Sequence, residues 1–259
     1  MACKYPVILV HGIASKELRI TNAFGRIGHK LRDAGERVFI ADIDSFGAIE
    51  TNAQQLKKYI LKVLEVTGAK KVNLIGHSKG GLDSKYAITH LDIEDKVASL
   101  TTLCTPHRGS IVASNIWDLP FWLKSTIAFW IDNFCHYVLR DERPNSMRAC
   151  EQLMHVDESE ETIAFSHAVY CQSFSSTLKR GNDCFLMALP NRIFKNYDDV
   201  ENDGLVSGHS ARFGNYRGEC LDISVSHVQI IDFFAKKSHR SQIYAFYLKL
   251  CEELAEMGF

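Results

Sequence analysis

The feature that most restricts the fold is a glycine-rich turn between an aliphatic run and a helical segment. The turn is Gly76–Gly81 (Gly-His-Ser-Lys-Gly-Gly), and the aliphatic run Val72–Ile75 has the composition of a strand buried on both faces. The segment Gly80–Thr89 is predicted to be a helix. In a sharp strand-to-helix turn, flanking glycines remove side chains that would collide, so we expect the Ser78 hydroxyl to stand clear at the sheet edge.

Apolar runs and helical segments alternate through the first half of the chain, and this order predicts an α/β fold. The other predicted strands are Val7–Val10, Arg37–Ile40 and Val97–Leu103, and the other predicted helices are Asn22–Ala34, Thr51–Gly68 and, at the end of the chain, Ser241–Ala255. Parallel strands need helical crossovers, so we expect a mostly parallel central sheet flanked by helices. No stretch has linker composition, which predicts a single domain over residues 1–259.

Aromatic residues crowd the segment Ile111–Leu139, where the alternation has stopped. Charged residues and a proline interrupt it, so it falls short of the ~20 uninterrupted apolar residues of a membrane span. It is either ordinary core or a mobile helical lid at the strand ends, and we favour a lid over residues 111–160. Three of its aromatic residues are then candidates for substrate binding: Trp117, Phe121 and Trp122.

Charge and cysteine content narrow the function classes. Lys and Arg total 30 and Asp and Glu total 31, so the formal net charge is −1 and nothing indicates nucleic-acid binding. The amino-terminal residues lack the features of a secretory signal, which predicts a cytoplasmic location for the sequence as written and leaves open secretion of a trimmed form. The eight cysteines form no CxxC pair, so we expect reduced thiols and no metal site.

A serine nucleophile needs a base, and the base needs an orienting carboxylate. The strand, GxSxG and helix context of Ser78 is that of the α/β-hydrolase nucleophile, for which the chain order is Ser, acid, His. His227 is the best-placed base, because it follows the apolar run Leu221–Val225, which is predicted to be the last strand. His239 lies among charged residues and is interpreted as part of a solvated surface turn.

The orienting acid is predicted at Asp203, in an Asn-Asp-Gly turn upstream of that strand. Three neighbouring carboxylates remain alternatives from the residues alone: Asp198, Asp199 and Glu201.

Two backbone amides are predicted to form an oxyanion hole. One belongs to Lys79, which follows the nucleophile, and the other to Ile13, in the loop after the first strand. In the same loop, Gly12 lets the backbone approach the substrate, and His11 is expected to hold the loop by hydrogen bonds.

The sequence resembles the bacterial true lipases of the Pseudomonas, Burkholderia and Proteus type. The motifs that carry the resemblance occur in the family's order and span nearly the whole chain. They are Tyr5–Gly12, Gly76–Gly81, Thr105–Ser110, Asn202–Val206 and Ser226–Val228. The last two look like the family's catalytic-acid and catalytic-histidine motifs, and this strengthens the assignment of Asp203 and His227.

The resemblance implies a triacylglycerol lipase with a Ser-His-Asp triad, a lid that opens at a lipid surface, and a structural calcium ion. This sequence departs from the family at the calcium site, because Gln229 occupies the position of an expected aspartate and leaves Asp183 as the one candidate carboxylate. We therefore expect no metal and no cofactor. The alternatives are an intracellular carboxylesterase or thioesterase for short soluble substrates, and a non-catalytic binding protein that keeps the fold.

Overall fold

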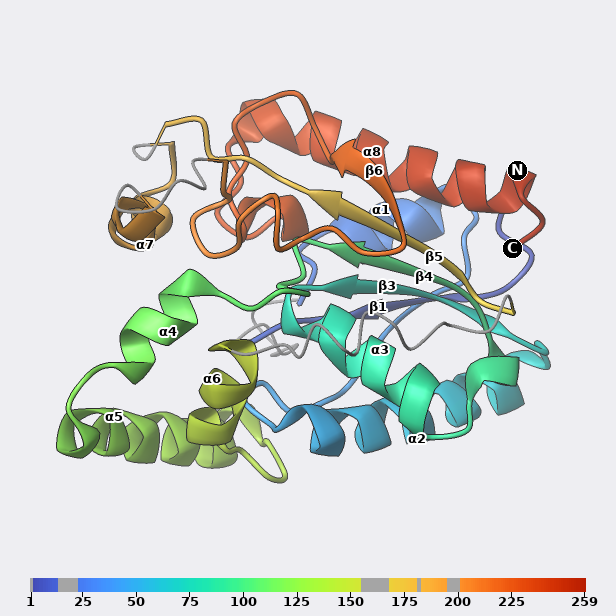
Figure 1. Ribbon diagram of the computed structural model, residues 1–259. Helices are drawn as coiled ribbons and strands as arrows, with labels where there is room; N and C mark the ends of the chain where they lie inside the picture. The colour runs from blue at the N-terminus through green and yellow to red at the C-terminus, as the bar shows by residue number, and fades with distance from the viewer. Residues whose placement is uncertain (1, 14–22, 155–167, 181–182, 195–200) are drawn as a thin grey trace.

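The computed structural model describes residues 2–13, 23–154, 168–180, 183–194 and 201–259 (Figure 1). Its centre is a six-stranded sheet in the order β2-β1-β3-β4-β5-β6, with every neighbouring pair parallel. This confirms the predicted parallel sheet. The strands are β1 (Val7–Val10), β2 (Val38–Ile40), β3 (Val72–His77), β4 (Val97–Leu103), β5 (Tyr170–Ser175) and β6 (Asn215–Glu219).

Helices cover both faces of the sheet, as Figure 1 shows. Two helices, α1 (Ile27–Asp33) and α8 (Lys237–Glu256), cover one face, and α2 (Ile49–Thr67) and α3 (Lys79–His90) cover the other. Each pair closes its own apolar cluster against alternate residues of the strands, because successive strand side chains point to opposite faces. Gly68 ends α2 at a φ of 66°, a left-handed conformation that glycine adopts without steric cost.

The segment after β4 forms helices beyond the carboxyl ends of the strands (Figure 1). These are α4 (Ile111–Trp117), α5 (Phe121–Phe134), the π-helical turn η2 (Cys135–Leu139) and α6 (Ser146–Met154). The aromatic residues on α5 are not ordinary core, since Phe121 and Trp122 are 73% and 69% exposed. Residues 155–160 of the predicted lid lie outside the described part of the chain.

Two buried carboxylates fasten the turn between η2 and α6 to the loop after β2. Asp44 accepts hydrogen bonds from the amides of Glu142 and Arg143, both at 2.8 Å. In the reverse direction, Asp141 accepts one from the Ser45 amide at 2.7 Å. Hydrogen bonds from backbone amides to carboxylates are charge-assisted, so this reciprocal arrangement holds the middle of the insertion against the loop after β2.

The prediction of a last strand at Leu221–Val225 is wrong. The strand that ends the sheet is β6, Asn215–Glu219, which pairs with β5. This strand lies at the edge of the sheet, where polar side chains can reach water, so its sequence lacks the apolar run that marks a buried strand. The apolar residues of Leu221–Val225 instead pack as an irregular segment in the cluster beneath α8.

The remaining elements are short. They are η1 (Glu94–Lys96), η5 (Phe185–Met187), α7 (Ala188–Ile193) and η7 (Gln229–Ile231). None of the helices among the described residues is long and apolar enough to cross a membrane.

We expect Gly80→Ala to destabilise the protein by roughly 1–3 kcal/mol. A Cβ at Gly80 would lie 2.4 Å from the backbone oxygens of both Val10 and His11, so α3 would have to move away from β1. The measurement is the free energy of unfolding in urea. Gly28→Ala is the matched control, since its Cβ would meet nothing closer than 3.5 Å within α1, and it should gain about 0.5–1 kcal/mol from helix propensity. Equal effects of the two substitutions would contradict this account.

Candidate active site

Ser78 lies at the sharp turn between β3 and α3, at φ 54° and ψ −131°. A non-glycine residue at positive φ is strained and persists only where the surrounding structure enforces it. Close packing enforces it here. A Cβ on Gly76 would lie 2.7 Å from the Gly81 Cα, and one on Gly12 would lie 2.6 Å from the Ser78 Cβ. The glycines of the turn are therefore required by steric contact.

Asp203 and His227 form a short buried pair, with Oδ2 2.7 Å from Nδ1. The other carboxylate oxygen of Asp203 accepts from the amides of Leu205 and Val206, at 2.9 and 2.8 Å. The His227 amide donates to the Asp203 carbonyl at 2.9 Å. These bonds fix both the carboxylate and the imidazole, and with a carboxylate oxygen as the acceptor Nδ1 is the donor of the pair.

His77 is a positioning group that sequence reasoning missed. Its Nε2 donates to the His227 carbonyl at 2.9 Å, and the two rings lie 4.6 Å apart between centroids. Burial, and after it the neighbouring His227, lowers the pKa of His77 well below its usual value, so this ring is neutral. Its place between Gly76 and Ser78 in the motif is the sequence signal that could have suggested a role.

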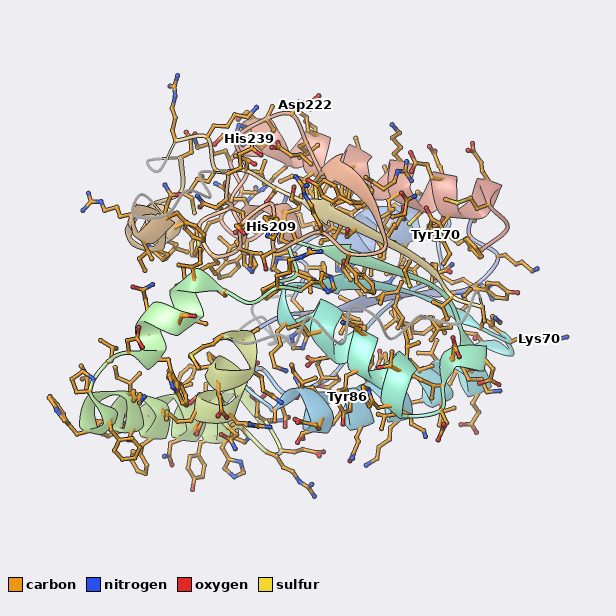
Figure 2. All side chains as sticks on the ribbon, in the orientation of Figure 1. Lys70, Tyr86, Tyr170, His209, Asp222 and His239 are labelled. Carbon is orange, nitrogen blue, oxygen red and sulfur yellow. The ribbon has the colours of Figure 1, made fainter. Side chains whose placement is uncertain are left out.

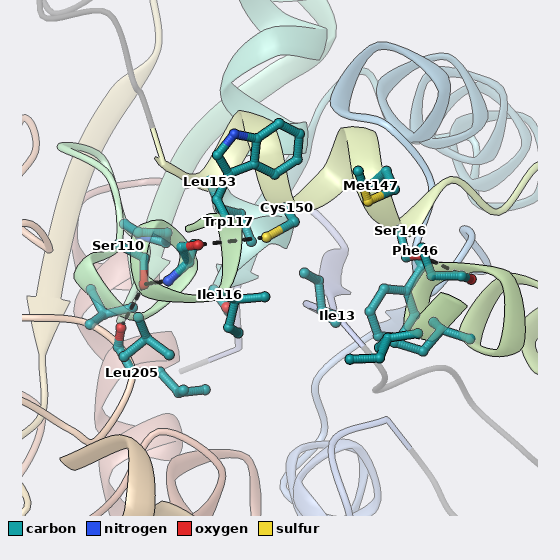
Figure 3. Close-up of a pocket in the computed structure, with 18 of the residues that line it drawn as sticks. Ile13, Phe46, Ser110, Ile116, Trp117, Ser146, Met147, Cys150, Leu153 and Leu205 are labelled. Carbon is teal, nitrogen blue, oxygen red and sulfur yellow. Dashed lines mark hydrogen bonds between the residues drawn. The ribbon is translucent and has the colours of Figure 1, made fainter. Parts of the chain in front are cut away.

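Ser78 and His227 line one cavity of about 390 Å³. Figure 3 shows this cavity, with Trp117 of α4 and Cys150 of α6 among the labelled residues. Ile13 and Phe46 line it from the sheet side, and Trp117 lines it from the end of α4. The wall is mainly apolar and comes from α4, α5, α6 and the loops at the strand ends. Its other residues include Val112, Ala113, Ile116, Leu119, Ile127, Ala128, Ile131, Met147, Leu153, Leu205, Val206 and Val228.

One of the residues predicted for an oxyanion hole follows Ser78 directly, and the other lines the same cavity. Lys79 is the first residue of α3, so its amide belongs to the helix end whose amides lack intrahelical partners. Ile13 lines the cavity, and Gly12 touches Ser78 as described above. His11 is buried, and its Nδ1 lies 2.9 Å from the Gly12 carbonyl, which agrees with the expected part in holding this loop.

Lys79 also forms a fully buried ion pair with Asp83, one turn along α3. The Nζ–Oδ1 distance is 2.6 Å and each side chain is 1% exposed. Asn52 of α2 donates to the other carboxylate oxygen at 3.1 Å and to the Asp44 carbonyl at 2.9 Å. Burial raises the pKa of Asp83 to about 6, although Lys79 opposes the shift, so the Asp83 carboxyl is mostly ionised at pH 8 and mostly protonated at pH 5.

Several predicted residues do not reach the cavity. Phe121 and Trp122 are exposed on α5 and are not among the lining residues, so their role in substrate binding stays a prediction. Among the alternative acids, Glu201 is exposed and Asp198 and Asp199 lie outside the described residues. His239 lies in the first turn of α8 rather than in a surface turn. Neither His239 nor His209, both labelled in Figure 2, is among the residues that line the cavity.

The residues at the position of the family's calcium site do not fit a calcium ion. Asp183 pairs with the Lys236 ammonium at 2.9 Å, and the Gln229 Nε2 donates to the Asp183 carbonyl at 3.3 Å. The Gln229 Oε1 accepts from the Ser226 amide at 3.1 Å. A calcium ion takes six to eight oxygen ligands. Here the Asp183 and Gln229 oxygens already accept hydrogen bonds from the Lys236 ammonium and from amide N–H groups.

Known proteins resemble this chain in sequence and in fold. A triacylglycerol lipase of Pseudarthrobacter phenanthrenivorans is 41% identical over 135 residues, or 49% of this chain and 42% of that protein. Triacylglycerol lipase 2 of Saccharomyces cerevisiae is 28% identical over 256 residues, or 88% of this chain and 72% of that protein. The crystal structure of Staphylococcus hyicus lipase matches with a TM-score of 0.75 at 16% identity, over 97% of this chain and 95% of that chain.

The fold is therefore that of the α/β hydrolases, as the sequence predicts. The family described as "Putative serine esterase (DUF676)" matches residues 5–211, and the chain belongs to this family. The expected relation to bacterial lipases is confirmed by the match to the Pseudarthrobacter protein and by one to a Burkholderia plantarii triacylglycerol lipase. The chain spans less than half the length of those two relatives.

Lys79→Met and Asp83→Asn should each destabilise the protein by about 3–5 kcal/mol, because each leaves a buried charge without its partner. The double substitution should cost much less than the sum. The coupling between the two sites, from urea unfolding of all four proteins, should be larger at pH 8 than at pH 5, where Asp83 is mostly protonated. Additive effects at both pH values would contradict the pairing.

Proposed function

We propose that this protein is a carboxylic ester hydrolase that uses Ser78 as its nucleophile, His227 as its base and Asp203 as the orienting acid. The observation that carries the proposal is the 2.7 Å Asp203–His227 hydrogen bond, because its histidine lines the same apolar cavity as the strained Ser78. A serine at a sharp turn, a base and a fixed carboxylate are the parts that acyl transfer requires.

In the proposed mechanism, the Ser78 oxygen attacks the ester carbonyl while His227 Nε2 accepts the hydroxyl proton. The amides of Ile13 and Lys79 stabilise the oxyanion, and the positive end of α3 adds to that stabilisation. His227 then returns the proton to the departing alcohol, and an acyl-enzyme remains on Ser78. Water, deprotonated by the same imidazole, releases the carboxylic acid. Asp203 holds the imidazole and stabilises its protonated form in both half-reactions.

The proposed substrate is a lipid ester, with triacylglycerols as the first class to test. Two sequence relatives bear the name triacylglycerol lipase. The cavity wall is mainly apolar, which suits an acyl chain. The exposed aromatic residues of α5, among them Phe129 and Trp130, suit a transient contact with a lipid surface. We propose no metal, cofactor or nucleic-acid partner. The alternative is an esterase or thioesterase for short soluble substrates.

Ser78→Ala should abolish both turnover of a soluble ester and labelling by a fluorophosphonate probe. Asp203→Asn should lower kcat by roughly 10⁴-fold, because the imidazole loses the partner that fixes its tautomer. Both variants should keep the far-UV circular dichroism of the wild type. Labelling of folded Ser78→Ala, or no labelling of the wild type, would overturn the assignment of the nucleophile.

Activity on an emulsified long-chain triacylglycerol should rise sharply once the substrate exceeds its solubility. Trp130→Ser should lower this rate severalfold and leave hydrolysis of a soluble short-chain ester unchanged, because Trp130 is exposed and lies outside the cavity lining. Leu61→Ser, at an exposed apolar residue of α2, is the control. Activity confined to the soluble ester would favour the esterase alternative.

A further inference from the structure

A lysine, Lys124, is among the residues that line the cavity beside Ser78. Among the described residues that line the cavity, the basic ones are Lys124 and the two histidines. None of the described lining residues is an aspartate or a glutamate. An apolar cavity built for a neutral lipid alone has no need of an ammonium group, because partial removal of a charge from water costs free energy.

The ammonium group of Lys124 lies between the helices that form the cavity wall. Lys124 belongs to the first turn of α5, and its Nζ lies over the Trp117 ring at 4.1 Å from the centroid. It also donates to the Trp117 carbonyl at 2.7 Å. On α6, burial raises the pKa of the Cys150 thiol and the Lys124 charge opposes that shift. The cavity lining includes all three of these residues, Trp117 of α4, Lys124 of α5 and Cys150 of α6. The ammonium therefore interacts with residues of the two helices that flank α5 in the sequence.

Lys124 has no carboxylate partner among the described residues. Its ammonium group contacts the Trp117 carbonyl and the Trp117 ring, and its charge lowers the pKa of the Cys150 thiol against the effect of burial. By contrast, the buried Lys79 has its full counter-charge in Asp83. A lysine ammonium has three N–H donors, and one of them satisfies the Trp117 carbonyl. Within the described part of the chain, the Trp117 carbonyl and ring are the groups that meet the ammonium, so two N–H donors are open to water or to a ligand.

We propose that the physiological substrate is an acyl ester that carries an anionic group, and that Lys124 binds this anion while Ser78 attacks the ester. The inference rests on the function proposed above and narrows its substrate class. A neutral ester that fills the cavity displaces water from the ammonium and offers no charge in return, whereas a phosphate or carboxylate offers a charge-assisted hydrogen bond. The anion belongs either to the alcohol, as in an acylglycerol phosphate, or to the acyl chain, as in a dicarboxylic monoester.

The test uses short, soluble substrates, so that no lipid surface contributes. One arm compares 1-hexanoylglycerol-3-phosphate with 1-hexanoylglycerol, and the other compares monomethyl adipate with methyl hexanoate. We expect the wild-type kcat/KM to favour the anionic member of one pair by tenfold or more. Lys124→Met should remove most of that preference, on the order of a tenfold to hundredfold loss carried mainly by KM, and Lys124→Arg should retain it.

The control is Lys62→Met, which removes the same charge from an exposed position on α2 and should leave both ratios unchanged. Equal kcat/KM values of the wild type within both pairs would overturn the proposal, even if Lys124→Met failed to fold. So would a preference that survives Lys124→Met. The proposed ester hydrolase function would still hold after either result, provided that the wild type hydrolyses the neutral esters and Ser78→Ala abolishes that turnover. No turnover of any of the four esters would instead count against the proposed function itself.

Discussion

The close approach of the first turn of α3 to the ends of β1 and β4 is the constraint on which the rest of the structure depends. Gly80 packs against the backbone oxygens of Val10 and His11, and Gly81 packs against Thr105. At these distances the helix can begin only immediately after β3, so Ser78 takes a backbone conformation with positive φ between them. Interiors pack too densely for such a contact to be relaxed locally. The strained serine is therefore a consequence of how tightly the helix and the sheet fit together.

Charges around this turn are arranged in two different ways. Two buried carboxylates near the turn have partners within the protein: Asp83 pairs with Lys79, and Asp203 pairs with His227 and two backbone amides. At the cavity wall, Lys124 has no carboxylate partner among the described residues. The difference follows from solvation, since a fully buried ion requires compensation within the protein, whereas an ion at a cavity wall retains access to water or to a ligand.

Local patterns predicted the elements that have strong apolar signals. The strands buried on both faces, such as β3 and β4, read as continuous aliphatic runs and lie where they were expected. The edge strand β6 was misplaced, because an edge strand exposes polar residues and its backbone pairing leaves no trace in the sequence pattern. Strand β5, whose sequence is Tyr-Cys-Gln-Ser-Phe-Ser, went unrecognised for a related reason: polar side chains such as Gln172 are buried there by hydrogen bonds to neighbouring strands.

The sequence by itself determined the parallel α/β architecture and the serine turn, because both depend on short-range order: apolar periodicity, and glycines at fixed spacing around Ser78. It also supplied the order of the serine, Asp203 and His227. Only the tertiary structure decided that Asp203 and His227, 24 positions apart, lie 2.7 Å from each other. It alone decided that Lys79 needs Asp83, that His77 holds the His227 loop, and that Lys124 faces the cavity. Those contacts join separate elements, and their energies depend on burial, which becomes defined only when the helices close over the sheet.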